Sequence, residues 1–325
     1  MGNRIWITWE NQRRNQTVSK AVGAKLLQFD IKLNRLMRYF FASAKTIFAI
    51  MSQKPTVIFA QNPSLVLSLL VVKYGNIFGI PVIIDEHNAG LFPLGGRRWW
   101  ANKIALHILK NANLTIVTNE NLQRYVEQRG KRSFILPDPI PEFKLNLTKK
   151  DLKGKYNILY ICTYAADEPY DEVIKAARGL DKNICIYITG NTKGREKELL
   201  NMLSKNVVIT GYLPENEYVN MLFAADMVMD LTKREDCLVC GAYEAVAAEK
   251  PMILSNTRAL KEYFSKGALY VNNDAEDIVS KVNEGIKSLK KLKTEVIELK
   301  KERIIDWTKR REALEELIKD MENHM

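Results

Sequence analysis

Strand-like and helix-like segments alternate along this chain. Short apolar runs such as Arg4–Trp9 and Thr56–Ala60 are followed by segments with helical spacing, which we predict over Thr17–Gln28, Leu33–Met51 and Leu65–Phe78. Strands that alternate with helices of this length form βαβ units around a parallel sheet. The sequence therefore predicts an α/β fold.

A cluster of prolines divides the chain into two halves. Residues 136–141 read Leu-Pro-Asp-Pro-Ile-Pro, and such a segment fits neither a helix nor a central strand. The alternation then resumes and ends in two predicted helices, Ala275–Leu289 and Thr294–Met321. Because 325 residues suffice for two domains, we predict two Rossmann-like domains joined by this linker, the first over residues 1–141.

The two halves differ in charge. Residues 1–150 hold 22 of the 49 Lys and Arg but only 8 of the 38 Asp and Glu, whereas residues 151–325 are almost neutral. A basic half attracts an anionic partner, such as an anionic membrane surface, a lipid-linked phosphate or a nucleic acid. The sequence has no helix-turn-helix, RNP or zinc-finger pattern, so we do not expect a nucleic acid partner.

The ends and cysteines of the chain suggest its compartment. The first residues lack the pattern of a signal peptide, and the four cysteines are expected to be free thiols in a reducing cytoplasm. No run of 18 uncharged apolar residues occurs, so we expect no transmembrane helix. We predict a cytoplasmic protein.

The loop at residues 232–241 follows a predicted strand and leads into a predicted helix. Gly241 allows a tight turn, and Glu244 is expected in the first helical turn, where free N–H groups favour a diphosphate. Lys233 and Arg234 are placed to neutralise phosphate charge. Alternatively, the segment is simply a helix with an acidic first turn, which the helix dipole also favours.

The acidic spacing in this segment resembles the E-x7-E signature of retaining glycosyltransferases with the GT-B fold, similar to family 4. Asp236 precedes Glu244 with seven residues between them, which makes the motif a D-x7-E variant, and Pro251 follows as it does in that family. The resemblance implies that Glu244 contacts the nucleotide ribose and that Asp236 lies near the donor sugar. Glu235 is the rival for the position of Asp236.

The resemblance also implies an architecture. GT-B proteins have two Rossmann-like domains facing a central cleft, and the second domain, here residues 142–303, binds the nucleotide sugar. Residues 304–325 correspond to the last helix, which crosses back to the first domain, and Gly190 resembles a strand-end glycine of the donor site. The family typically needs no metal, so we expect no metal and no cofactor beyond a UDP- or GDP-linked sugar as substrate.

The chain departs from the family after the first strand of the second domain. The Arg and Lys that often bind the donor diphosphate there are replaced by Thr163–Pro169, which contains Asp167 and Glu168. The pair Cys237 and Cys240 has no second cysteine pair at the spacing of a zinc site. The two cysteines therefore either have a redox role or stand at this spacing by coincidence.

Three places in the first half are candidates for the acceptor side and for catalysis. Arg13 and Arg14 follow the first strand, where an arginine pair suits a phosphate or a uronate carboxylate. Asp85, Glu86 and His87 end another predicted strand, and the resemblance implies that His87 touches the donor sugar or moves a proton. At the end of the preceding strand, a turn that resembles one in the same family supplies a further acceptor residue, Asn62. A surface arginine pair and a structural histidine are the alternatives.

Basic and aromatic residues adjoin at Arg97, Arg98, Trp99 and Trp100, and also within Leu33–Met51. Tryptophan is favoured at the level of lipid headgroups, where arginine meets phosphate. We therefore expect peripheral attachment to the inner face of an anionic membrane, although ordinary core packing would also account for the aromatic residues.

These observations predict a glycosyltransferase that moves a sugar from a nucleotide-diphosphate donor to a lipid-linked or polysaccharide-precursor acceptor. Two alternatives stay open at this point. A nucleotide-sugar epimerase uses the same fold, and a non-catalytic partner of a membrane glycosyltransferase complex would share the charge pattern.

Overall fold

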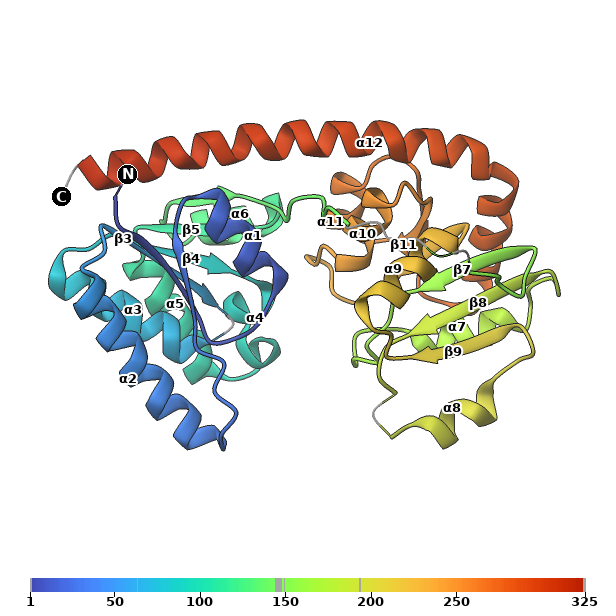
Figure 1. The fold of residues 1–325 in the computed structure, drawn as a ribbon, viewed down its shortest axis with the longest axis horizontal. Coiled ribbons are helices and arrows are strands. Elements are labelled where there is room, and N and C mark those ends of the chain that lie inside the picture. The colour runs from blue at the N-terminus through green and yellow to red at the C-terminus, as the bar shows by residue number, and fades with distance from the viewer. Residues whose placement is uncertain (1, 63, 144–147, 149, 193, 324–325) are drawn as a thin grey trace. The chain divides into compact units, whose positions relative to one another are not determined.

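The computed structural model describes residues 2–62, 64–143, 148, 150–192 and 194–323, and it divides into two compact units (Figure 1). The first unit consists of Met1–Asp138 with Asp306–Met325, and the second of Pro139–Ile305. Each unit contains a six-stranded parallel sheet flanked by helices. The predicted α/β class with two Rossmann-like sheets is therefore confirmed.

The sheet of the first unit has the order β2-β1-β3-β4-β5-β6. The strand order changes direction at β1, which pairs with both β2 and β3. Ligands of open parallel sheets bind beyond the carboxyl ends of the strands at such a switch point. The strands are β1 (Arg4–Thr8), β2 (Lys25–Gln28), β3 (Val57–Asn62), β4 (Val82–Glu86), β5 (Leu114–Val117) and β6 (Ser133–Ile135).

Helices cover both faces of this sheet. Ile5 and Ile7 of β1 pack with α2 and α3 on one face, and Trp6 packs with α1 and the end of α12 on the other. The helices are α1 (Arg13–Ala21), α2 (Arg35–Gln53), α3 (Leu65–Phe78), α4 (Asn88–Leu91), the 3₁₀ helix η1 (Pro93–Gly96), α5 (Trp99–Asn111) and α6 (Glu120–Glu127).

The C-terminal residues of the chain belong to the first unit. Helix α12 (Ala275–Asn323) is one helix where we predicted two, and its Leu314 and Ile318 are fully buried in the core around Trp6. Arg4 forms ion pairs with Glu315 at 2.6 Å and with Glu322 at 2.8 Å. Residues 324 and 325 lie outside the described part of the chain.

The sheet of the second unit has the order β12-β11-β10-β7-β8-β9, so its switch point lies between β7 and β10. Its strands are β7 (Tyr156–Tyr160), β8 (Ile184–Thr189), β9 (Val207–Gly211), β10 (Met227–Asp230), β11 (Met252–Ser255) and β12 (Ala268–Val271). Besides the start of α12, its helices are α7 (Tyr170–Ala177), α8 (Glu196–Met202), α9 (Glu215–Ala224), α10 (Cys240–Ala247) and α11 (Arg258–Tyr263).

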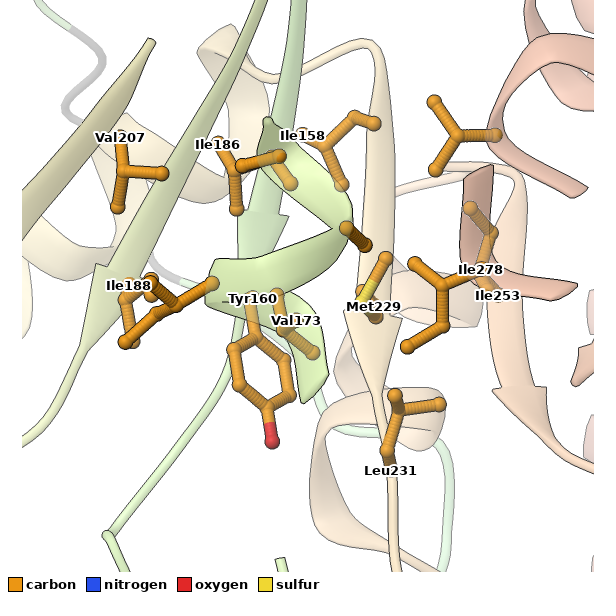
Figure 2. Close-up of a cluster of buried hydrophobic side chains, with 14 of the residues drawn as sticks. Ile158, Tyr160, Val173, Ile186, Ile188, Val207, Met229, Leu231, Ile253 and Ile278 are labelled. Atoms are coloured by element: carbon orange, nitrogen blue, oxygen red, sulfur yellow. The ribbon is translucent and has the colours of Figure 1, made fainter. Parts of the chain in front are cut away.

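Figure 2 shows one of the two cores of this second sheet. Ile158 and Tyr160 of β7 pack with Ile186 and Ile188 of β8, and α7 contributes Val173 to the same cluster. Burial of this apolar surface fixes the strands, and with them the loops that follow their carboxyl ends.

One predicted helix is wrong at its end. The segment Thr17–Gln28 was predicted as a single helix, but α1 ends at Ala21 and Lys25–Gln28 is the edge strand β2. Gly23 has a positive φ of 63° and turns the chain between them. The sequence analysis also missed α6 and β6, which are short.

None of the helices within the described residues is both long and apolar enough to cross a bilayer.

Candidate functional site

The loops after β7 and β10 meet at the switch point of the second sheet. The backbone N–H of Lys233 donates to the Asp167 carbonyl oxygen at 2.7 Å, and the Arg234 guanidinium lies 3.0 Å from the Asp167 carboxylate. Thr232 Oγ1 also donates to this carboxylate, at 3.1 Å. Both predicted phosphate ligands, Lys233 and Arg234, are thus exposed at the edge where a ligand is expected, and Arg234 is held by an acidic partner.

The loop after β7 directs several N–H and O–H groups at the carboxylate of Glu168, a residue of the same loop. The Glu168 carboxylate accepts hydrogen bonds from Thr163 N at 2.8 Å, Thr163 Oγ1 at 2.9 Å and Ala165 N at 2.9 Å. Tyr164 between these donors has a positive φ of 58°. Convergent N–H groups of this kind bind anions, so Glu168 occupies a place that suits a phosphate oxygen.

Helix α10 begins beside a buried carboxyl group. Gly241 N donates to Asp230 Oδ2 at 2.7 Å, and burial together with nearby carboxylates raises the pKa of Asp230 well above its usual range. A Cβ on Gly241 would lie 2.5 Å from Asp230 Oδ2. The glycine is therefore required by close packing and not by a tight turn, because its φ is not positive.

Glu244 lies in the second turn of α10, one turn later than predicted, because the helix begins at Cys240. Its side chain is half-buried and accepts a hydrogen bond from the Tyr218 hydroxyl. Glu235 is exposed and accepts from Arg258 N at 2.9 Å, at the start of α11, whereas Asp236 is half-buried. Glu235 thus contacts the start of the neighbouring helix α11.

Gly190 stands where β8 approaches the end of β7. Its φ is +101°, and a Cβ at this position would lie only 1.9 Å from the Cys162 carbonyl oxygen. Any side chain would push these two strand ends apart, so Gly190 keeps the loop after β7 in place.

The pair Cys237 and Cys240 lies in the loop after β10 and at the first residue of α10. Neither cysteine is in a disulfide, and burial raises the pKa of Cys237 to about 11. A thiol with such a pKa is protonated at neutral pH and is a poor nucleophile. Within the described residues, no group of three or more His, Cys, Asp or Glu side chains is arranged to hold a metal ion.

In the first unit, polar side chains from β3, from the end of β4 and from the segment after β1 converge at the switch point. Gln61 Oε1 accepts from Asn15 Nδ2 at 2.7 Å, and Gln61 Nε2 donates to Gln12 Oε1 at 2.6 Å. Gln61 Nε2 lies 3.3 Å from His87 Nε2, which in turn lies 3.6 Å from Asp85 Oδ2. His87 is the member of this network placed to meet a ligand, since 27% of its side chain is exposed and it precedes the first turn of α4.

Arg14 does not have the position expected of an acceptor ligand. Its side chain is 4% exposed and forms a two-point ion pair with the fully buried Asp85, with Nε–Oδ2 at 2.8 Å and Nη2–Oδ1 at 2.6 Å. Arg14 also contacts Asp138 at 2.7 Å and donates to the Leu136 carbonyl oxygen at 2.9 Å. Its neighbour Arg13 is exposed, because successive residues of an α-helix point about 100° apart around its axis.

The two carboxyl groups before His87 are also inside the protein. The Arg14 guanidinium holds the pKa of Asp85 well below its usual range, so Asp85 is an ionised group that orients His87 from behind. Burial raises the pKa of Glu86 to about 8, and Asn62 Nδ2 donates to Glu86 Oε1 at 2.9 Å. The expectation that Asp85, Glu86 and Asn62 contact a substrate is therefore not supported by their positions, because all three are buried strand residues.

Several residues were not predicted to belong to these two sites. Gln12, Asn15 and Gln61 build the network around His87, and Asp167, Glu168 and Asp230 shape the second site. The rule that ligands bind beyond strand ends would have selected all of them once the strand order was known.

The comparisons with known proteins decide the class of the second unit. Residues 144–303 match the family described as glycosyl transferases group 1. The chain is a glycosyltransferase with the GT-B fold. No curated protein matches its sequence.

Solved structures share the fold of this glycosyltransferase at low identity. Sucrose-phosphate synthase from Thermosynechococcus elongatus is 15% identical with a TM-score of 0.73, covering 93% of this chain and 84% of its own. Anabaena HepE in complex with UDP and glucose is 11% identical with a TM-score of 0.75, covering 98% and 100%. S. aureus MnaA with UDP is 13% identical with a TM-score of 0.64, covering 91% of both chains.

Proposed function

We propose that this glycosyltransferase takes its sugar from a nucleoside-diphosphate donor bound at the carboxyl edge of the second sheet. The observation that carries the proposal is Glu244, half-buried on α10 beside the switch point and held by Tyr218, within the segment that matches the family. Glu244 accepts the ribose hydroxyls, and Lys233 and Arg234 meet the diphosphate. Similar proteins whose solved structures contain UDP or UDP-glucose support a uridine donor.

We also propose that the sugar is transferred with retention of configuration. In this scheme, Asp236 faces the positive charge that develops on the sugar ring. The interior positions of Asp85 and Glu86 support this outcome, because an inverting enzyme needs a base that reaches the acceptor. The anomeric configuration of the product, measured by NMR, tests it.

The acceptor is, in this proposal, a lipid-linked or polysaccharide-precursor saccharide that meets the basic first unit at Arg13 and His87. The excess of Lys and Arg over Asp and Glu in residues 1–150 supports an acceptor with phosphate or carboxylate groups. We place the enzyme in the cytoplasm, at the inner face of the membrane.

Thermal denaturation with UDP, GDP and ADP and their sugars tests the donor site. We expect one nucleotide family to stabilise the wild type, since a ligand at a hundredfold its Kd adds about 2.7 kcal/mol. Glu244→Ala should abolish the shift, whereas Glu217→Ala on the neighbouring α9 should keep it. Absence of any shift in the wild type would contradict the proposed donor.

A nucleotide-sugar epimerase is the second candidate function. One similar solved structure, from Listeria monocytogenes with a TM-score of 0.59, is named as a UDP-N-acetylglucosamine 2-epimerase. Interconversion of the donor sugar without any acceptor would identify this activity instead.

Glu168→Gln is expected to tighten UDP binding about tenfold, which corresponds to about 1.4 kcal/mol. The carboxylate sits among the N–H groups that suit a phosphate, so a diphosphate close by meets a like charge that the amide lacks. Isothermal titration with UDP measures the change, and Asp171→Asn at the start of α7 is the control for loss of one negative charge. Weaker binding by Glu168→Gln would mean that the carboxylate shapes the loop for the donor.

A further inference from the structure

Helix α2 exposes large apolar side chains at its N-terminal end. Leu36 is 82% exposed and Phe40 is 67% exposed, and they lie one turn apart on the same stripe of the helix. Ala42 and Ile50 of the same helix are buried in the core against the sheet. A helix of a soluble monomer normally turns polar residues outward, so this outer stripe lacks a partner within its unit.

The next helices on the same face extend the exposed apolar surface. Helix α2 packs against α3, and α3 packs against α5, so their N-terminal ends lie along one edge (Figure 1). Trp99 at the start of α5 is 70% exposed, Trp100 is 48% exposed, and Leu94 of η1 is 62% exposed. The alternative that these tryptophans are core residues is therefore wrong.

This edge is also the edge that carries His87. In a parallel sheet, each helix begins where the preceding strand ends, so the N-termini of α2, α3 and α5 lie at the carboxyl ends of the strands. We call the exposed residues there the docking surface. It comprises Arg35, Leu36, Arg38, Phe40, Phe41, Leu94, Arg97, Arg98, Trp99, Trp100 and Lys103.

The segment that carries the docking surface has an excess of positive charge. Residues 32–111 contain ten Lys and Arg but only two acidic residues, and these two, Asp85 and Glu86, are buried. The basic groups adjoin the aromatic rings: Arg38 lies 5.3 Å from the ring centre of Tyr39, and Lys103 lies 4.8 Å from that of Trp99. Exposed tryptophan beside arginine and lysine is the composition of the lipid headgroup level.

We propose that the docking surface binds an anionic lipid bilayer, with its apolar side chains at the boundary between headgroups and acyl chains. Complementary charge favours this partner, because the surface offers four arginines and one lysine and no acidic side chain, and arginine beside tryptophan suits the phosphate level of a bilayer. The biological role of this binding rests on the proposed function, because it would bring the sheet edge that carries His87 close to a lipid-linked acceptor. Its geometry does not depend on the donor.

Vesicle co-sedimentation tests the docking surface. We expect the wild type to bind vesicles that contain phosphatidylglycerol, to bind phosphatidylcholine vesicles far less, and to lose binding at high salt. The combined change Phe40→Ser and Trp99→Ser should weaken binding at least about tenfold, as should Arg97→Gln with Arg98→Gln. Lys20→Gln with Lys25→Gln, which removes two exposed charges elsewhere in the unit, should bind like the wild type.

The thermal shift induced by nucleotides and the oligomeric state in solution complete the test. The thermal shift that a nucleotide induces in each variant reports whether the chain is folded and its donor site intact. A variant that keeps the thermal shift of the wild type but no longer binds vesicles has lost only the docking surface. Equal vesicle binding by all variants would overturn the proposal. A wild type that ignores vesicles but forms dimers, which Phe40→Ser with Trp99→Ser converts to monomers, would overturn it in favour of a contact between copies of the chain.

Discussion

Replacing Arg14 by methionine is expected to lower the free energy of unfolding of the first unit by about 3–5 kcal/mol. The change leaves Asp85 as an unpaired charge, because the carboxylate is fully buried and Arg14 supplies its two-point ion pair. It also removes the contacts to Asp138 and the Leu136 carbonyl. Urea denaturation of both proteins at pH 7 measures the loss.

Two controls separate structural from functional effects at this position. Lys20→Ala, an exposed change on the same helix, should alter stability by less than about 0.5 kcal/mol. Adding Asp85→Leu to Arg14→Met should recover part of the lost stability, because the second change removes the stranded charge. A stable Arg14→Met protein that loses only acceptor turnover would show that Arg14 acts on the ligand.

The ion pair also determines how acid affects this unit. The pKa of Asp85 is lower in the folded state than in the unfolded chain, so its contribution to stability is present above the unfolded value, near 3.8. The contribution is lost as the pH falls below that value, because the unfolded state then takes up a proton that the folded state does not.

The sequence predicted the architecture well because a parallel α/β fold depends on local patterns. Apolar runs such as Thr56–Ala60 and helical spacing over Leu65–Phe78 are each readable within about ten residues, and the linker is visible from its prolines. The edge strand β2 was missed because Lys25–Gln28 is short and only its pairing with β1 makes it a strand.

The candidate site was harder to predict because its contacts join distant parts of the chain. Arg14 meets Asp85 and Asp138, which are 71 and 124 positions away, so no local pattern tells a buried ion pair from an exposed arginine pair. The sequence places Asp85 and Glu86 at the end of a strand, but it does not show that β4 continues through Glu86 with both side chains buried. The polar residues at these strand ends are visible in the sequence, but their burial follows from tertiary packing.

Glu168 illustrates the same limit in the second unit. The sequence shows that the basic residues typical of the loop after β7 are absent, and that two acidic residues stand there. Only the structure reveals that the Glu168 carboxylate turns back onto Thr163 and Ala165 of its own loop. Such a contact needs the positive φ at Tyr164, which a sequence does not disclose.

Glu86→Gln is expected to remove a pH dependence of stability from the first unit. Burial raises the pKa of Glu86 from 4.5 to about 8 in the folded state. Between these two values the folded protein keeps a proton that the unfolded chain releases, so the wild type loses stability as the pH rises, by about 3–5 kcal/mol in total. Glutamine stays neutral and can still accept the hydrogen bond from Asn62.

Urea denaturation from pH 5 to pH 9 measures this difference. The two proteins should be about equally stable near pH 5, and Glu86→Gln should become the more stable one as the pH approaches 8. Glu120→Gln at the start of α6, where the carboxylate is exposed, should follow the wild type at every pH. Parallel curves for the wild type and Glu86→Gln would mean that Glu86 reaches water, and its side chain would then regain a place among the candidate bases beside His87.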